Sequence, residues 1–185
     1  IMNSQILLIF TRTPLHVGAG SSVGAIDQPV IRERHTRFPV IPGSSLKGVL
    51  RDELQNSRQF SQDQIDKIFG KNESAGLFSF GEARLLAFPV RSCKGAFALV
   101  TSPIALQRFK RDAGLSHLPD VPIVSEMTCL AAPSVVLSSP TGAKAVVLEE
   151  YRFDCKGEFP SEWANCLSSL LTDAVLQGAQ SRFVL

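Results

Sequence analysis

The pattern of apolar and polar positions predicts strands and helices in alternation along this chain. Gln5–Thr11 is apolar and rich in residues that favour strands, which predicts a buried first strand. After a long irregular stretch, apolar residues recur at helical spacing behind Pro42, and Ser44 or Ser45 is the expected N-cap of this helix. The residues expected to face the core are Leu46, Val49, Leu50 and Leu54.

The same patterns predict the later elements. They are a helix over 62–69 closed by Gly70, a strand over 77–90 bent at Gly81, a strand over 96–101, a helix capped by Ser102, a strand over 145–155 and a helix over 161–177 capped by Ser161. Between 115 and 144, prolines interrupt short β-prone pieces, which predicts an extended β-hairpin or arm projecting from the core.

The order of these elements indicates the fold class. Strand, glycine-rich loop, helix, strand, strand, helix and strand fit an α+β fold of the ferredoxin-like (RRM-like) βαββαβ plan. A chain of 185 residues with 44% hydrophobic residues is expected to form a single domain, 1–185, with a real core. Phe183–Leu185 reads as the start of another strand, so we expect a C-terminally incomplete fold from a longer protein.

Charge and cysteine content narrow the function classes. The formal net charge is only +2, so a nucleic-acid site must be a local patch, and basic residues do cluster. No apolar run is long enough to span a membrane, and we expect no membrane partner. The four cysteines form no CxxC pair, which argues against zinc and for reduced thiols in a cytoplasmic protein.

The stretch from His16 to Arg51 carries the candidate chemistry. Glycines in its first part let backbone approach a ligand closely, and the PGSSLKG segment opens a helix whose N-terminal amides favour anions. Basic side chains nearby suggest several phosphates, hence a polynucleotide. The candidate RNA-binding residues are Gly18, Gly20, Ser44, Ser45, Lys47, Arg51 and, in a later turn, Lys94.

Asp27 and His16 are the candidate catalytic residues, and each has a simpler reading. Asp27 stands alone in an otherwise uncharged glycine-rich segment. It is either a turn-forming aspartate or a group that holds a divalent metal, Mg²⁺ or Mn²⁺, and orients a 2′-hydroxyl for attack on the adjacent phosphate. His16 is either a general acid or base, or a packed, hydrogen-bonded histidine after the first strand.

Four stretches carry a specific resemblance: LHVGAGSSVGAID, RERHTRFPVIPGSSLKGVLR, GEARLLAFPVRSCKGAFALVTSPIALQRFKRD and VVLEEYRF. They resemble the RAMP-superfamily backbone subunits of type III-B CRISPR effector (Cmr) complexes. The resemblance implies a subunit that stacks in a filament on CRISPR guide RNA beside other Cmr subunits. It also implies a β-hairpin thumb that distorts the duplex between guide and complementary target RNA.

The resemblance places the family's aspartate for divalent-metal-dependent cutting of target RNA on Asp27, and its histidine on His16. The family's C-terminal region, with a further glycine-rich loop and acidic and aromatic residues, has no counterpart in this chain. Two alternatives stay open. One is a RAMP scaffold that binds guide RNA without cutting, which Asp27 disfavours. The other is a standalone endonuclease that processes precursor guide RNA by a histidine-centred, metal-independent mechanism.

Overall fold

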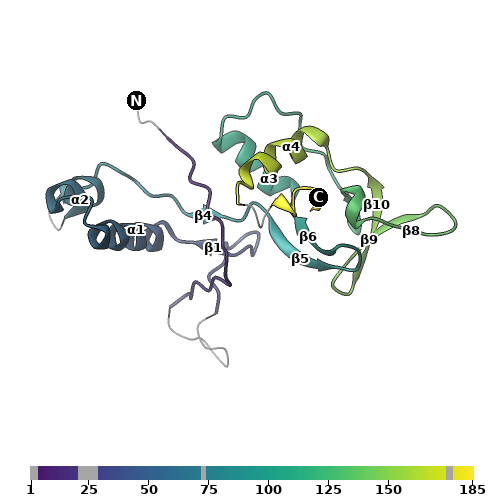
Figure 1. The fold of residues 1–185 in the computed structure, drawn as a ribbon, viewed down its shortest axis with the longest axis horizontal. Helices are drawn as coiled ribbons and strands as arrows, with labels where there is room; N and C mark the ends of the chain where they lie inside the picture. Colours follow the sequence, from purple (N-terminus) through teal and green to yellow (C-terminus); the bar gives the residue numbers. More distant parts are fainter. Residues whose placement is uncertain (1–3, 21–28, 72–73, 174–176) are drawn as a thin grey trace. The chain divides into compact units, whose positions relative to one another are not determined.

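The computed structural model describes residues 4–20, 29–71, 74–173 and 177–185. The chain divides into two compact units (Figure 1). The N-terminal unit is Ile9–Leu85, and the C-terminal unit is Leu86–Leu185 together with Ile1–Leu8. The fold mixes helices and strands, as expected, whereas the single RAMP domain over 1–185 stays a prediction.

A nearly closed sheet forms the framework of the C-terminal unit. Its strands are β5 (Phe88–Ser92), β6 (Ala96–Val100), β7 (Thr128–Leu130), β8 (Leu137–Ser138), β9 (Lys144–Leu148), β10 (Tyr151–Gly157) and β11 (Phe183–Val184). The order is β11-β6-β5-β9-β10-β7, with β8 paired to β9. β7 and β11 run parallel to their neighbours β10 and β6, and the other pairs are antiparallel. A bridge between Ala131 and Val184 joins the two ends of this order, so the sheet almost closes on itself.

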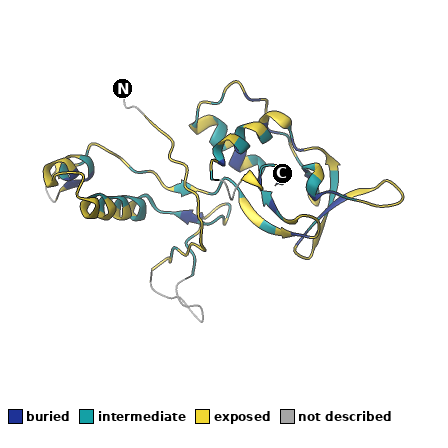
Figure 2. Cartoon of the chain, in the orientation of Figure 1, coloured by how far each residue is buried: buried dark blue, intermediate teal, exposed yellow. Residues whose placement is uncertain are grey.

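Two helices cover the main core of this unit. α3 (Pro103–Asp112) starts as predicted, with Pro103 in its first turn and the Ser102 hydroxyl accepting a hydrogen bond from the Ala105 amide at 3.3 Å. α4 (Ser161–Leu170) contributes Trp163, which is completely buried. Figure 2 shows buried residues concentrated on the inner faces of these helices and strands. The core residues are Leu106, Leu118, Val121, Phe159, Trp163, Leu167, Leu171, Ala179, Phe183 and Leu185.

Two predicted elements of the C-terminal unit are wrong in extent. The strand expected over 145–155 is a hairpin, because the chain turns at Glu149 (φ 51°) between β9 and β10. Left-handed backbone at a glutamate gives no turn signal in the sequence. The helix predicted over 161–177 is not continuous: α4 ends at Leu170, and residues 171–173 are not helical. Pro160 is the N-cap of α4, without a side-chain cap from Ser161.

The structure does not confirm a thumb over 115–144. Leu118 and Val121 pack into the main core, while Cys129 and Val135 are buried in a second apolar cluster beside the short 3₁₀ helix η1 (Pro133–Val135). Beyond η1, β8 and β9 form a hairpin whose loop extends away from the sheet (Figure 1). Most of this range therefore belongs to the body of its unit.

The N-terminal unit combines a small antiparallel ladder with two helices. β1 (Val40–Ile41) pairs with β4 (Ala83–Arg84), and β2 (Gly70–Lys71) pairs with β3 (Ser74–Ala75). The helices are α1 (Gly43–Ser57) and α2 (Gln62–Phe69). α2 matches its predicted bounds, because Ser61 and Gln64 form a capping box and Gly70 (φ 84°) ends it.

Several predictions for this part of the chain are wrong. Gln5–Thr11 forms no strand, and Leu7 in it is 65% exposed. Apolar composition favours burial, but a strand also needs a neighbouring backbone, and the described residues supply none here. Residues 77–82 are likewise outside any strand, and Val49 on α1 is 70% exposed. Since the first strand is not formed, the ferredoxin-like plan is not confirmed.

Candidate nucleic-acid interface

A short ladder forms the base of the glycine-rich loop. The Ala19 amide donates to the Pro29 carbonyl and the Ile31 amide to the Val17 carbonyl, both at 2.9 Å, with Gly18 opposite Val30. Gly20 has φ 96°, a conformation that favours glycine over residues with a side chain. The structure thus pairs Gly18 with Val30, and Gly20 directly follows the last paired residue, Ala19.

The two candidate catalytic residues lie at the ends of this loop in the sequence. His16 is exposed and directly precedes Val17, so it stands at the start of the ladder rather than in a core. The reading of His16 as a packed histidine is therefore not supported. Asp27 belongs to residues 21–28, which lie outside the described residues. Its role stays a prediction.

The basic run forms the tip of a hairpin next to the ladder. Arg32 bridges to Pro39, and its guanidinium donates to the Arg37 carbonyl at 2.9 Å. Arg37 adopts a left-handed conformation (φ 61°) that turns the chain. The exposed cations of this tip are Arg32, Arg34 and Arg37, and His35 is exposed beside them. Three guanidinium groups on one turn can contact several phosphates.

Glu33 lies inside this basic tip and was not among the predicted site residues. Its carboxylate is buried, and it accepts a hydrogen bond from the Thr36 hydroxyl. Arg84 of β4 and His35 both lie 3.8 Å from it. The sequence did carry a signal for it, because Glu33 is the single acid in the segment RERHTR, among three arginines and a histidine. Such a segment favours a carboxylate that is stabilised by neighbouring cations.

The start of α1 comes directly after β1 and Pro42. The helix begins at Gly43 with Pro42 as N-cap, and it has neither a side-chain cap nor an acid in its first turn. The prediction that Ser44 or Ser45 caps the helix is therefore wrong, since both lie within the first turn. A Cβ atom at Gly43 would lie 2.2 Å from the Phe80 carbonyl oxygen, so only glycine allows this close approach. The uncapped first turn leaves backbone donors for an anion.

The structure separates the two basic residues predicted on α1. Lys47 is partly buried, and the described residues give it no ion-pair partner. Arg51, one turn later, donates to Asp66 of α2 at 3.2 Å and to the Gly70 carbonyl at 3.3 Å. Lys47 therefore remains the better candidate for a phosphate contact, and Arg51 joins the two helices.

Lys94 lies in the other unit and has a structural role there. Its ammonium donates to the Val136 carbonyl at 2.6 Å and to the Pro133 carbonyl at 3.1 Å. These bonds fix the turn between β5 and β6 against η1. The RNA contact predicted for Lys94 would compete with them.

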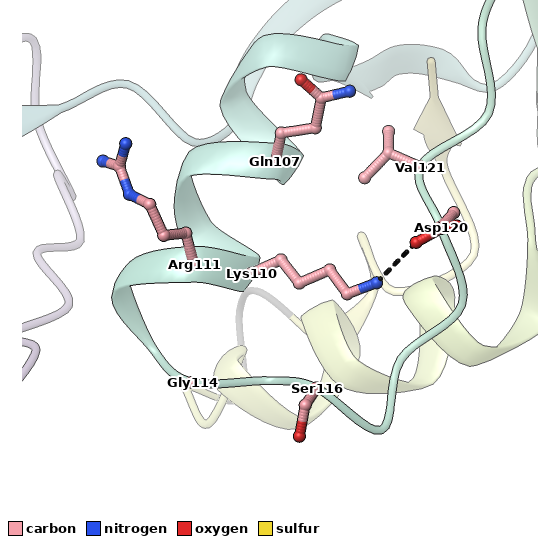
Figure 3. A pocket seen from close by; sticks show the side chains of 7 residues that line it. All are labelled: Gln107, Lys110, Arg111, Gly114, Ser116, Asp120 and Val121. Carbon is pink, nitrogen blue, oxygen red and sulfur yellow. Dashed lines mark hydrogen bonds and ion pairs between the residues drawn. The ribbon is translucent and has the colours of Figure 1, made fainter.

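A separate pocket lies between the end of α3 and the loop that follows it (Figure 3). Lys110 points across it to Asp120 at 3.1 Å and also donates to the Pro119 carbonyl. Arg111 on the same turn is bound by Asp112 at 2.7 Å. The cations of this pocket are thus neutralised locally, and none of the predicted site residues lines it.

Two absences hold for the part of the chain that the structure describes. No group of three or more His, Cys, Asp or Glu side chains there could hold a metal ion. None of the described helices is both long enough and apolar enough to cross a membrane.

A mixed fold with a nearly closed sheet, and a glycine-rich loop followed by a PGSSLKG helix start, define the class of protein. The family model of the RAMP superfamily matches residues 9–172, and the chain belongs to this superfamily.

Within it, the chain is similar to subunits of type III CRISPR complexes. It is 44% identical over 155 residues to the CRISPR system Cmr endoribonuclease Cmr4 of Pyrococcus furiosus, which covers 81% of this chain and 52% of that protein. It is 32% identical over 148 residues to the Cms endoribonuclease Csm3 of Mycobacterium tuberculosis, covering 69% of this chain and 62% of that protein.

A solved structure of a Cmr4 protein has a similar fold. The crystal structure of oligomeric Cmr4 from Pyrococcus furiosus superimposes with a TM-score of 0.76 at 35% identity, covering 95% of this chain and 66% of that one. The chain thus spans about half to two thirds of the length of these relatives.

Proposed function

We propose that this chain is the RNA-binding backbone subunit of a type III-B CRISPR effector complex and that it cuts complementary target RNA within that complex. The observation that carries the proposal is the 44% identity to a protein named a Cmr endoribonuclease, which extends over most of the chain. The similarity to an oligomeric Cmr4 supports association with further copies, and the Cmr name of the relatives supports other Cmr subunits as partners.

Guide RNA binding rests on the N-terminal unit. The exposed arginines of the 32–37 tip, Lys47 and the uncapped start of α1 present charge and backbone donors to phosphates. Such contacts position a nucleic-acid backbone without reading its bases. This suits a subunit that must accept any guide sequence and leave the guide bases to pair with target RNA.

Cutting rests on Asp27 and His16. In the proposed reaction the 2′-oxygen of the target RNA forms a bond to the adjacent phosphorus as the bond to the 5′-oxygen breaks. The Asp27 carboxylate orients the attacking 2′-hydroxyl and accepts its proton as the new bond to phosphorus forms. His16, exposed at the base of the loop, is the candidate acid that protonates the leaving 5′-oxygen.

The proposal includes a divalent metal ion, which needs only a few protein ligands when substrate phosphate completes its coordination. The described residues offer no cluster of three ligands, but Mg²⁺ is often held by one or two carboxylates together with substrate phosphates. Asp27 and the scissile phosphate would supply such a set for Mg²⁺ or Mn²⁺. When bound, the ion would offset the negative charge that develops on the phosphate.

The test is Asp27→Asn in a reconstituted complex that contains the full-length subunit. Aspartate and asparagine both form turns, so guide binding, assembly and target capture are expected to stay within about twofold of wild type. Cleavage is expected to fall to background, with or without Mg²⁺ or Mn²⁺. Full cleavage by the variant would contradict the role of Asp27.

Two other outcomes select the alternatives. Target capture without cleavage by the wild-type complex, in either metal, would indicate a scaffold. Cutting of precursor guide RNA by the isolated chain in EDTA would indicate a processing endonuclease.

A further inference from the structure

Two cysteines stand side by side in the sheet of the C-terminal unit. Cys129 on β7 and Cys155 on β10 are direct partners in the parallel pairing of these strands. Neighbouring strands lie about 4.8 Å apart. A disulfide joins residues whose Cα atoms are about 4.4–6.8 Å apart. The backbone positions of this pair therefore suit a disulfide without a large movement of either strand.

The two side chains lie on the same face of the sheet. Both belong to the second apolar cluster, in which Cys129 is 2% exposed and Cys155 packs against the buried residues. Burial is the main cause of the raised pKa of Cys129, and smaller contributions come from the charge of Cys155 and from a hydrogen bond between the two side chains. The thiols are therefore neighbours, and both are free in the structure.

The two thiols differ in their access to solvent. Cys155 is partly exposed, and its thiol donates to the Gly157 carbonyl at 3.3 Å. Cys129 is buried and protonated, so a reagent in solution meets Cys155 first. An accessible thiol with a second thiol beside it is the arrangement in which the first is oxidised and the second resolves the product into a disulfide.

The pair lies where the sheet closes on itself. β7 pairs with β10 on one side, and on the other side Leu130 and Leu185 exchange backbone hydrogen bonds of 3.0 and 2.9 Å. The register of β7 against β10 shifts directly after Cys155. This short, irregular pairing holds the closing strand, so a covalent bond at Cys129 would strengthen it.

We propose that Cys129 and Cys155 form a site of oxidative modification, at which glutathione disulfide or a similar small disulfide converts the two thiols into a cross-strand disulfide that fastens β7 to β10. The Cys155 sulfur attacks one sulfur of the reagent, which forms a mixed disulfide and releases one glutathione thiol. The Cys129 sulfur loses its proton to solvent, attacks the Cys155 sulfur and releases the second glutathione. The two protein thiols lose two electrons, and one glutathione disulfide becomes two thiols.

The test exposes the full-length subunit to glutathione disulfide at about pH 8 and digests it with trypsin in the absence of reductant. Trypsin cuts after lysine and arginine, so the two cysteines fall in separate peptides, 112–144 and 153–156. Mass spectrometry is expected to find these peptides joined in most chains, with the mass of two hydrogen atoms lost. Dithiothreitol should separate them.

Cys155→Ser and Cys93→Ser are the matched variants. Each removes a thiol that solvent can reach, but only Cys155 is paired with Cys129. The joined peptides are expected to disappear in Cys155→Ser and to remain in Cys93→Ser. If Cys155→Ser does not fold, Cys129→Ala carries the same readout.

Amide exchange at Leu130 and Ala131 shows whether the disulfide fastens β7. These amides donate to the Leu185 and Gly157 carbonyls at the closure of the sheet. Their exchange is expected to slow about tenfold after oxidation and to recover with dithiothreitol, because local opening controls exchange. In Cys155→Ser the same treatment should leave the exchange unchanged.

Three results would overturn the proposal. One is a glutathione adduct that stays on Cys155, or no reaction there while Cys93 is modified. Another is a disulfide from Cys129 or Cys155 to Cys93 or Cys166. The third is a Cys129–Cys155 disulfide that leaves the exchange of Leu130 and Ala131 unchanged. None of them bears on RNA cleavage, which Asp27→Asn tests separately.

Discussion

The Arg51 guanidinium of α1 lies 3.2 Å from the Asp66 carboxylate of α2 and also donates to the Gly70 carbonyl at the end of that helix. A cation at the C-terminal end of a helix is favourable, and here it links the two helices of the N-terminal unit. Lys47 lies one turn before Arg51 on α1, and its ammonium has no such partner among the described residues. The two residues are therefore expected to respond differently to substitution.

Lys47→Gln is expected to weaken binding of guide RNA by about tenfold at low salt, irrespective of base sequence. A plot of log affinity against log salt concentration should become shallower by roughly 0.7 for one lost phosphate contact to a single strand. The measurement is a salt titration of RNA binding by the assembled subunit. An unchanged slope would remove Lys47 from the interface.

Arg51→Gln is expected to act on stability instead. Loss of a partly exposed ion pair and a hydrogen bond should lower the free energy of unfolding by about 1 kcal/mol, with little change in the salt dependence of RNA binding. Chemical denaturation measures the first quantity. Asp66→Asn is the matched control, since it removes the same pair from the other side and should give a similar loss. A large change in RNA affinity with normal stability would restore the original interpretation of Arg51.

Local signals in the sequence predicted some elements in full. Ser61 and Gln64 set the start of α2, and Gly70 sets its end. Both ends were predictable because capping depends on residues next to the helix in the sequence. The Ser102-Pro103 start of α3 is predicted for the same reason. Where the determinant is a neighbour distant in sequence, the prediction failed. Gln5–Thr11 is apolar enough for a strand, yet no described strand pairs with it.

The candidate site shows the same division. The glycines and the PGSSLKG segment marked the loop base and the helix start from sequence alone. The partners of Arg51 and Lys94 could not be predicted, because Gly70 and Val136 approach them only in the folded chain. Glu33 was missed because its burial depends on β4, which contributes Arg84 from far along the sequence.

Lys94→Met is expected to destabilise the C-terminal unit without changing RNA affinity. The ammonium satisfies one carbonyl at the start of η1 and one just after it, and methionine keeps the apolar stem but removes both hydrogen bonds. The expected loss is about 1 kcal/mol in the free energy of unfolding, measured by denaturation. Lys144→Met on the same unit is the control, since Lys144 is exposed at the start of β9. Weaker RNA binding by Lys94→Met, with unchanged stability, would instead support the phosphate contact.

The last prediction concerns Cys129, which stands opposite Cys155 in the pairing of β7 with β10. Burial, with smaller contributions from the neighbouring Cys155 and Asp154, raises the pKa of Cys129 to about 12. The thiol therefore stays protonated in the folded chain. Because the thiolate is the reactive form, an alkylating reagent at pH 8 should modify exposed Cys93 rapidly and Cys129 only on unfolding.

The same shift predicts how stability depends on pH. An unfolded thiol has its ordinary pKa of 9.0, whereas the folded Cys129 thiol keeps its proton to about 12. Between these values the unfolded state binds fewer protons, so the free energy of unfolding should fall as pH rises from about 9 to about 12. Cys129→Ala should make this fall shallower. Burial also raises the pKa of Cys166, so part of the slope should remain. Denaturation across this pH range, with mass spectrometry of the alkylated chain, checks both expectations. Equal labelling rates for Cys129 and Cys93 in the native protein would contradict the burial of Cys129.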